Sequence, residues 1–365
     1  MKLLSVFGTR PEAVKMAPVL LALDLEPFVQ SQVCVTGQHR ALLDQVLGFF
    51  SIVPDFDLDA MAPGQGLNPL AGRLIERLDA VLEKVRPDRV IVQGDTTSAL
   101  AGALAAFHRS IPVAHVEAGL RTYCAAAPFP EEANRRAIAL LADMHFAPTA
   151  AAKANLAAER LRGEVLVTGN SGVDALNLAL AAIGPDPQPA GTGRKLILVT
   201  CHRRESFGAP FAAICAALER LDRRPDVEIA FPRHPNPALA GAPAGPRDLP
   251  PLDLPDFLRL MRRADLILTD SGGVQEEAVT LGKPVVVLRD ATERPEGGAM
   301  LAGGDTDRIV RAAEAHLDGS AEAARPSQAY GDGRAAERIV NALLGRPVAE
   351  FVPDIGARDR LREIG

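Results

Sequence analysis

The sequence has no tryptophan and only two tyrosines among its 365 residues. So few aromatic rings leave few surfaces on which nucleobases could stack. The formal net charge of −6 also lacks the basic excess that is typical of nucleic-acid-binding surfaces. No apolar run approaches the length that spans a bilayer. We therefore expect no nucleic-acid partner and no insertion into a membrane.

Cysteine is scarce as well, with four in the chain. Their spacing fits neither a metal-binding motif nor a disulfide framework, and it is typical of reduced thiols in the cytoplasm. The chain opens directly on a strand-like segment at residues 2–7, so no secretory leader is expected. The sequence predicts a cytoplasmic protein without a bound metal. The four cysteines are Cys34, Cys124, Cys201 and Cys215.

Short segments rich in Val, Ile and Leu alternate with segments of helical periodicity along most of the chain. This alternation predicts an α/β fold with two Rossmann-like, doubly wound domains built on parallel sheets. The expected strands are residues 2–8, 32–37, 89–94, 113–118, 144–148, 165–168, 195–201, 227–232, 266–269 and 284–288. The expected helices are residues 11–25, 67–85, 98–107, 131–141, 210–221, 256–263 and 274–281.

A segment rich in proline and glycine at residues 184–193 indicates a domain boundary, which we expect between residues 170 and 193. The predicted domains are residues 1–170 and 171–345, followed by a tail at 346–365. A last helix at 334–344 could dock on either domain. In open α/β folds, ligands bind where the carboxyl ends of the strands meet, so we expect a central cleft there.

The first strand leads through Gly8 and Thr9 into a helix that carries Arg10 and Lys15. A helix N-terminus beside two cationic side chains favours an anion. The simpler alternative is a helix cap with solvated charges, and this segment alone does not separate the two.

Three carboxylates follow neighbouring strands of the first half, at Asp95, Glu117 and Glu131. Asp95 could also serve as an ordinary helix cap. Carboxylates gathered at adjacent strand ends repel one another, so we expect one of them to have a raised pKa and to act as an acid.

The second half places a basic cluster, His202 to Glu205, after its first strand. Such a cluster suits a phosphate or a general acid. Further on, Ser271, Gly272 and Gly273 lead from a strand into a helix, which is the arrangement of a diphosphate-binding turn. It is neither a Walker A motif nor a G-x-G-x-x-G motif.

With these segments, the sequence resembles the non-hydrolysing UDP-N-acetylglucosamine 2-epimerases of bacteria. The similarity is carried by FGTRPEAVKMAPV, GDTTSALAGALAAF, HVEAGLRT, PFPEEANRR, HRRESFG and LTDSGGVQEEAVTLGKPVVVLRDATERPE. The resemblance implies a glycosyltransferase-B arrangement, a homodimer, and no metal or nicotinamide cofactor. It also implies conversion of UDP-GlcNAc to UDP-ManNAc for surface polysaccharides, by anti elimination of UDP to 2-acetamidoglucal and re-addition.

The resemblance assigns roles to residues at matching positions. The acid/base groups would be Asp95, Glu117 and Glu131, with His202 assisting at the diphosphate. The residues that contact the substrate would be Arg10, Lys15, Arg135, Phe257, Ser271, Gly272, Gly273, Glu277 and Arg294. Within that set, Glu277 would hold the ribose, Phe257 the uracil, and Arg294 the diphosphate.

Activated members of this family hold a second UDP-GlcNAc beside the first. Candidate residues for that activator site are Gln38, Glu132, Arg204 and His234. The loop after Glu296, which lies near the nucleotide in this family, is shorter in this chain. The chain has Ala41 and Gly64 where activated members carry a glutamine and an arginine. We therefore expect weakened or absent activation by substrate.

Several other functions share this architecture. A hydrolysing 2-epimerase would release UDP and free ManNAc, although the GDTT sequence at residues 94–97 is the non-hydrolysing form. A related UDP-diacetamido sugar could be the substrate. A non-catalytic UDP-sugar sensor or a glycosyltransferase fits the fold, but neither needs three neighbouring carboxylates.

Overall fold

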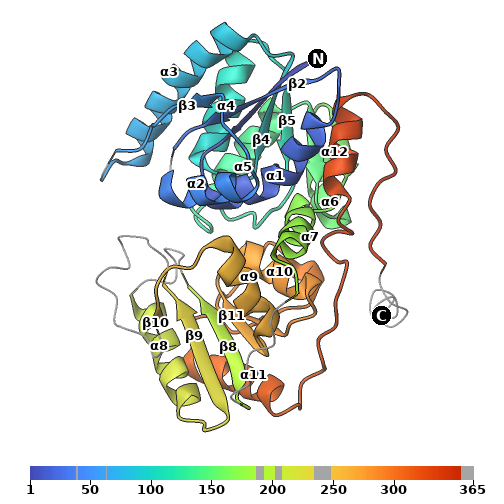
Figure 1. Ribbon diagram of the computed structural model, residues 1–365. Coiled ribbons are helices and arrows are strands. Elements are labelled where there is room, and N and C mark those ends of the chain that lie inside the picture. Colours follow the sequence, from blue (N-terminus) through green and yellow to red (C-terminus); the bar gives the residue numbers. More distant parts are fainter. Residues whose placement is uncertain (38–39, 63, 186–192, 202–207, 234–247, 355–365) are drawn as a thin grey trace. The chain divides into compact units, whose positions relative to one another are not determined.

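The computed structural model describes residues 1–365 except for 38–39, 63, 186–192, 202–207, 234–247 and 355–365. The chain forms two compact α/β units (Figure 1). The first comprises Met1–Leu178 and Gly331–Pro353, and the second is built on Ala179–Tyr330. Within the described part of the chain, no helix combines the length and the apolar character that crossing a membrane requires.

The first unit contains a seven-stranded parallel sheet in the order β3-β2-β1-β4-β5-β6-β7. Its strands are mostly buried, which explains their continuous Val, Ile and Leu content. All six strands expected in this half are present, and the two-residue β3 is an addition that is too short for a sequence signal. The strands are β1 (Lys2–Phe7), β2 (Gln30–Val35), β3 (Phe56–Asp57), β4 (Arg89–Gln93), β5 (Val113–Val116), β6 (Met144–Ala147) and β7 (Glu164–Val167).

The helices of the first unit cover this sheet in two groups. Helices α3, α4 and α5 pack side by side, and α1 packs against α2 and α12. Because β1 pairs with both β2 and β4, the winding direction reverses there, and right-handed crossovers place the two groups on opposite faces. The helices are α1 (Arg10–Asp24), α2 (Arg40–Phe49), α3 (Leu67–Val85), α4 (Thr97–His108), α5 (Glu131–Leu141), α6 (Ala150–Ala158), α7 (Ser171–Ile183) and α12 (Ala335–Leu343).

The second unit repeats the plan with a six-stranded parallel sheet in the order β10-β9-β8-β11-β12-β13. Here β8 pairs with both β9 and β11, which creates a second reversal of winding. The strands are β8 (Lys195–Thr200), β9 (Val227–Pro232), β10 (Asp248–Leu249), β11 (Leu266–Thr269), β12 (Val285–Val287) and β13 (Met300–Leu301). The helices are α8 (Ala209–Asp222), α9 (Leu254–Arg263), α10 (Gly272–Thr280), α11 (Thr306–Leu317) and the short 3-10 helix η3 (Pro295–Gly297). The predicted pair of doubly wound α/β domains is therefore confirmed.

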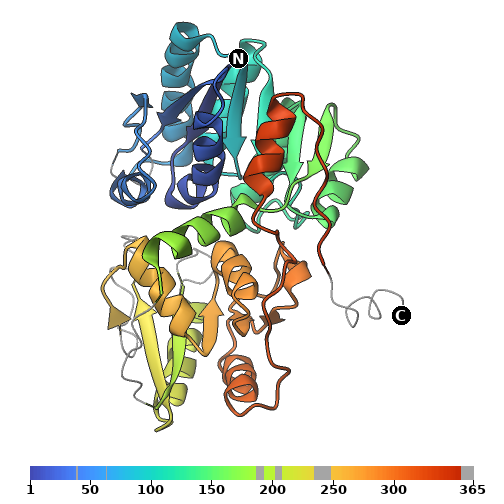
Figure 2. The same ribbon diagram turned by 45° about the vertical axis from the view of Figure 1, so that its right-hand side comes forward.

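The carboxyl-terminal segment returns to the first unit, where α12 packs on α1 (Figure 2). The Asp174 carboxylate on α7 accepts hydrogen bonds from the backbone N–H groups of Ala335, at 3.2 Å, and Ala336, at 2.8 Å. It thus caps the N-terminus of α12. Farther on, the N–H of Phe351 donates to the carbonyl of Val167 at 2.8 Å.

This division of the chain differs from the predicted limits of 1–170 and 171–345. Residues 171–178 and 331–345 belong to the first unit. The contacts that hold them there join residues 161 and 162 positions apart, from Asp174 to α12. Local periodicity carries no information about pairings that are so distant in sequence.

The Asp174 cap predicts a pH-dependent stability. Burial raises the pKa of Asp174 to about 6, and Asp332 adds to the rise, while the bonds from Ala336 and Ala335 oppose it. Because the folded pKa lies above the unfolded value of 3.8, this group's contribution to stability is present below pH 4 and is lost as pH rises through 6. We expect a loss of about 3 kcal/mol over that window, at 1.36 kcal/mol per pKa unit.

The measurement is urea unfolding of the wild type and Asp174→Asn at pH 4.5 and pH 7.5. The variant lacks the titration, so its stability relative to the wild type should rise between the two pH values. Asp44→Asn, at an exposed position on α2, controls for the loss of one charge. A difference between wild type and Asp174→Asn that does not change with pH would contradict the prediction.

Candidate active site

The loops after β1 and β4 meet at the point where the winding of the first sheet reverses. The carboxylate of Glu12 accepts hydrogen bonds from the N–H groups of Gly8, at 2.9 Å, and Thr9, at 2.8 Å, and from the hydroxyl of Thr96. Burial raises the pKa of Glu12, although the bonds from Thr96, Gly8 and Thr9 act in the opposite direction. Glu12 therefore joins the two loops. The sequence-based assignments do not include Glu12, although the Thr9–Glu12 spacing of a capping box was a usable signal.

Glu117 lies directly after β5 with its side chain almost fully buried, at 8% exposure. One carboxylate oxygen, Oε1, accepts from the ammonium of Lys15 and from Nδ2 of Asn170 at 3.2 Å. The other, Oε2, accepts from Nε2 of Gln93 at 2.5 Å. The backbone of Glu117 has φ of 64°, a left-handed conformation that is uncommon for a residue with a side chain. The site thus holds this carboxylate in one fixed position.

The imidazole of His115 precedes Glu117 on β5 and is fully buried. Its Nε2 donates to the carbonyl of Gly94 at 2.7 Å. Burial lowers the pKa of His115 to about 3, and this exceeds the opposing effects of Gly94 and of the Glu117 charge. His115 is therefore neutral near pH 7 and acts as a structural group.

Asp95 follows β4 and keeps part of its carboxylate accessible, with 24% of the side chain exposed. Arg135 on α5 forms an ion pair with it, and Nδ2 of Asn134 donates to the Asp95 carbonyl at 2.9 Å. Glu131 is the first residue of α5 and is half-buried, where the helix dipole favours a negative charge. The structure therefore brings Asp95 and Arg135 together as an ion pair and places Glu131 on the same helix as Arg135.

Glu132 is fully buried beside these residues. Its carboxylate accepts from the N–H groups of Thr122, at 3.0 Å, and Tyr123, at 3.1 Å, and from Arg135 at 3.4 Å. These contacts bind the loop after β5 to α5. In this conformation Glu132 supports the loop, whereas the sequence suggested a role at an activator site.

Arg10 and Lys15 both lie on α1. Arg10 is the first residue of the helix and is half-buried. The ammonium of Lys15 is 9% exposed and pairs with Glu117. The predicted cationic N-terminus is present, with the charge of Lys15 directed to the carboxylate.

The predicted diphosphate turn lies in the second unit, where the winding of its sheet reverses. Ser271 is the N-cap of α10, and its hydroxyl accepts from the N–H of Val274 at 3.5 Å. The N–H of Ser271 donates to the hydroxyl of Thr269 at 2.9 Å, and that hydroxyl also bonds with the hydroxyl of Thr200 at 2.5 Å. The turn is thereby fixed to two neighbouring strands, with a helix N-terminus suited to an anion.

Arg294 is buried in the second unit beside this turn. Its guanidinium pairs with Glu276 at 2.7 Å and with Glu293. Its carbonyl accepts from Nε2 of Gln275 at 2.7 Å and from the hydroxyl of Tyr330 at 2.8 Å. The sequence predicts Arg294 at the diphosphate, but it does not indicate the two glutamates that compensate the charge of this side chain.

Glycine at position 272 is required by this packing. A Cβ there would lie 2.4 Å from one guanidinium nitrogen of Arg294 and 2.6 Å from its Cζ. A Cβ at Gly273 would meet nothing within 4 Å. Glu277 lies half-buried on α10, and Phe257 lies half-buried on α9. The structure thus places five of the six predicted substrate contacts of this unit on or against α10, and the sixth, Phe257, on α9.

Four predicted residues, Gln38, His202, Arg204 and His234, lie outside the described residues. Within the described ranges, no group of three or more His, Cys, Asp or Glu side chains could hold a metal ion.

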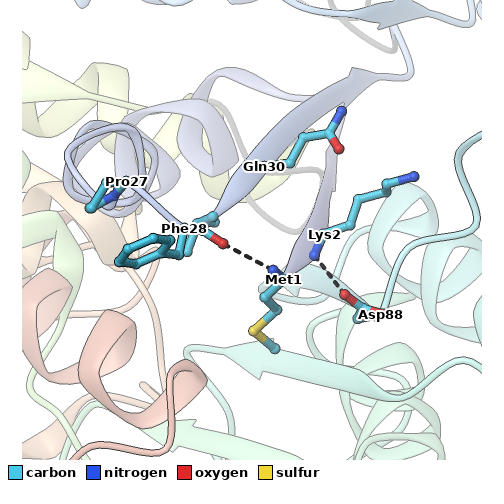
Figure 3. A pocket seen from close by; sticks show the side chains of 7 residues that line it. Met1, Lys2, Pro27, Phe28, Gln30 and Asp88 are labelled. Carbon is cyan, nitrogen blue, oxygen red and sulfur yellow. Dashed lines mark hydrogen bonds between the residues drawn. The ribbon is translucent and has the colours of Figure 1, made fainter.

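A surface hollow of about 380 Å³ lies at the opposite, amino-terminal edge of the first sheet (Figure 3). The terminal ammonium of Met1 donates to the carbonyl of Phe28 at 2.9 Å, and the N–H of Lys2 donates to Asp88 at 2.7 Å. None of the predicted site residues lines this hollow.

The chain is similar to proteins of known family over most of its length. A sequence profile of the family "UDP-N-acetylglucosamine 2-epimerase" matches residues 21–344. The UDP-N-acetylglucosamine 2-epimerase of Escherichia coli K12 is 47% identical, over 94% of this chain and 98% of that protein. The protein of the same name from Bacillus subtilis is 46% identical, over 94% and 95%.

Solved structures agree with this similarity. The UDP-GlcNAc 2-epimerase of Neisseria meningitidis, bound to UDP-GlcNAc, is 42% identical with a TM-score of 0.88, over 95% of this chain and all of that one. The enzyme of Methanocaldococcus jannaschii, in complex with UDP-GlcNAc and UDP, is 32% identical with a TM-score of 0.83, over 94% of this chain and 100% of that one. Spinosyn rhamnosyltransferase SpnG, at 15% identity and a TM-score of 0.53, shares the fold alone.

The contact between Gly272 and Arg294 generates a prediction about stability. Gly272→Ala should displace the guanidinium from Glu276 and Glu293, because the methyl group and the guanidinium would overlap. Breaking buried ion pairs in this way should lower the free energy of unfolding by about 3 kcal/mol. Gly273→Ala, one position along the same helix, should change it by less than about 1 kcal/mol. Urea unfolding compares the two variants, and equal stabilities would refute the proposed overlap.

Proposed function

The chain belongs to the UDP-N-acetylglucosamine 2-epimerase family, and we propose that it interconverts UDP-GlcNAc and UDP-ManNAc without hydrolysis. The observation that supports this most directly is the carboxyl edge of the first sheet. It carries a fixed carboxylate at Glu117, a partly accessible one at Asp95, and a third at the start of α5. A reaction that moves a proton from one face of a carbon to the other needs more than one acid/base group.

The reaction proceeds by elimination and re-addition. A base removes the proton from C2 of the sugar, the electron pair forms a C1–C2 double bond, and the bond from C1 to the UDP oxygen breaks. A proton then returns to the other face of C2 as UDP adds back to C1. The C2 proton is weakly acidic, so stabilisation of the departing diphosphate must carry much of the barrier.

We assign the proton transfers to the carboxylates of Asp95, Glu117 and Glu131. Ser271, Gly272 and Gly273 would donate hydrogen bonds to the diphosphate at the N-terminus of α10. Arg10 and Lys15 supply positive charge from α1, and Arg135 orients Asp95 through their ion pair.

The remaining assignments are taken from the family resemblance. Phe257 would contact the uracil, Glu277 the ribose, and Arg294 the diphosphate. His202 would assist at the diphosphate. Because Glu276 and Glu293 already compensate the Arg294 guanidinium, its part in this scheme is to shape the turn around Gly272.

We further propose that the protein is a cytoplasmic homodimer that supplies precursors of surface polysaccharides. The nucleotide sugar would be its partner, without a metal or a nicotinamide cofactor. Light scattering of the purified protein in solution tests the homodimer.

The direct test of function is proton NMR of the purified protein with UDP-GlcNAc in D2O. We expect deuterium at C2 and accumulation of UDP-ManNAc, because C2–H cleavage precedes re-addition. Asp95→Asn should slow both deuterium exchange at C2 and formation of UDP-ManNAc by at least about 100-fold, as expected for loss of an acid/base group. Glu76→Gln, at an exposed position on α3, is the matched control and should behave as the wild type.

The other outcomes separate the alternatives. Free ManNAc together with UDP would identify a hydrolysing 2-epimerase. Activity with a UDP-diacetamido sugar and none with UDP-GlcNAc would identify the diacetamido sugar as the substrate. Binding of UDP-GlcNAc without any exchange at C2 would identify a sensor.

The shape of the rate curve tests the proposed lack of substrate activation. Ala41 and Gly64 lack the polar side chains that hold a second UDP-GlcNAc in activated members of the family. We therefore expect a hyperbolic dependence of the initial rate on UDP-GlcNAc concentration. A strongly sigmoidal curve would overturn this proposal.

A further inference from the structure

We propose that Gln93 and Asn170 are positioning residues that, together with Lys15, hold the Glu117 carboxylate as a proton acceptor. This proposal rests on the proposed function and deepens it, because it assigns the role of proton acceptor to one of the three carboxylates. It concerns side chains from three separate parts of the first unit, which are the end of β4, the start of α7 and helix α1. All three contact the carboxylate of Glu117.

The orientation of the Asn170 amide is fixed by a second hydrogen bond. Its Oδ1 accepts from the N–H of Gly172 at 2.8 Å. The Nδ2 group must therefore face Glu117, where it donates to Oε1 at 3.2 Å. Asn170 is 2% exposed, so water does not compete freely for this contact.

Gln93 acts on the other oxygen of the same carboxylate. It is the last residue of β4, and its side chain is buried at 2% exposure. Its Nε2 donates to Oε2 of Glu117 at 2.5 Å. A Cβ at the next residue, Gly94, would lie 3.8 Å from the same oxygen, so the backbone closes around the carboxylate.

Lys15 completes the set from the side of α1. Its ammonium pairs with Oε1 of Glu117. A Cβ at Gly172 would lie 3.1 Å from Oδ1 of Asn170 and 3.4 Å from Cε of Lys15, so both side chains pack against the first turn of α7. The lysine is thereby kept on the carboxylate.

These three contacts all come from N–H donors. Hydrogen bonds that are donated to a carboxylate stabilise its ionised form. A proton on Oε1, which accepts two of these bonds, would replace one of them. Glu117 is therefore arranged to receive the C2 proton in one direction of the reaction, and the return proton must come from another group.

Three other titratable groups near this edge have contacts of their own. Asp95 forms an ion pair with Arg135, and His115 is held neutral by burial, with a pKa of about 3. Glu12, whose pKa is raised by burial, bonds with Gly8, Thr9 and Thr96. Lys15 is a cation that pairs directly with Glu117.

The test uses two nearly isosteric variants of the full-length protein, Gln93→Glu and Asn170→Asp. Each replaces the N–H donor that faces Glu117 with a carboxylate oxygen, and Asn170→Asp retains the acceptor for Gly172. A second carboxylate beside Glu117 should favour its protonated form. We expect the acidic limb of the kcat/KM profile for C2 deuterium exchange to move about 1–2 pH units upward. The KM for UDP-GlcNAc should stay within about threefold, since ground-state binding is not the contact removed.

Gln93→Met keeps the length of the side chain and removes its polar groups. Because one hydrogen bond to a charged group is lost, kcat should fall by about 10- to 100-fold. The melting temperature of Gln93→Met should be no lower than that of Gln93→Glu. Asn341→Asp, on α12, is the matched control for amide-to-acid exchange. Its described side-chain contact is with Arg346, so the pH profile should remain that of the wild type.

The outcomes distinguish this inference from the proposed function. A wild type that does not exchange C2 would refute the proposed function before any variant is compared. An active wild type with unchanged pH profiles in both acid variants, and kcat within threefold in Gln93→Met, would overturn the positioning role. If the acid variants failed to fold, the kcat of Gln93→Met, with KM unchanged, would decide the question.

Discussion

A carboxylate that is removed from water must be met by hydrogen-bond donors or by a cation, and the first unit depends on this constraint at three positions. Glu12, Glu117 and Glu132 are all buried, and each accepts bonds from residues that lie on other segments of the chain. Glu12 joins the loops after β1 and β4, and Glu132 joins the loop after β5 to α5. Removing any one partner would leave a charge unpaired in a region of low dielectric. The loops that carry the reacting groups are therefore held by the same acids that make the edge polar.

In the second unit the buried charge is positive, and carboxylates compensate it. Here the buried cation is Arg294, and Glu276 and Glu293 compensate it. A guanidinium so compensated contributes little net charge to an anion nearby. Attraction for a diphosphate must then come mainly from the N-terminus of α10, where N–H groups lack partners within the helix. Gly272 allows the guanidinium to pack against the first turn of that helix, so the glycine serves packing as well as access to the backbone.

The sequence was sufficient for the longer strands of both sheets and for the strand ends at which polar residues gather, but it missed the two-residue strands β3, β10 and β13. It predicted ten strands and the alternating helices, because buried parallel strands leave continuous apolar runs between turns. It did not find Gln93 and Asn170, since an amide beside a carboxylate has no sequence signature and depends on segments that are 24 and 53 residues from Glu117. The same reason explains the docking of α12, which depends on the distant Asp174. The motifs indicate residues that would contact a substrate. The structure also identifies the residues that hold these side chains in place.

The backbone of Glu117 connects these observations. Its φ of 64° is unfavourable for a residue with a Cβ, at a cost of about 1–3 kcal/mol that the surrounding structure must offset. Bonds from Lys15 and Gln93 to opposite oxygens of the carboxylate offset it. A glycine would adopt the same conformation without strain, and it would leave the donors of Lys15, Gln93 and Asn170 unsatisfied. The local strain and the buried amides are thus two parts of one arrangement, in which the fold fixes the position of a carboxylate before any substrate binds.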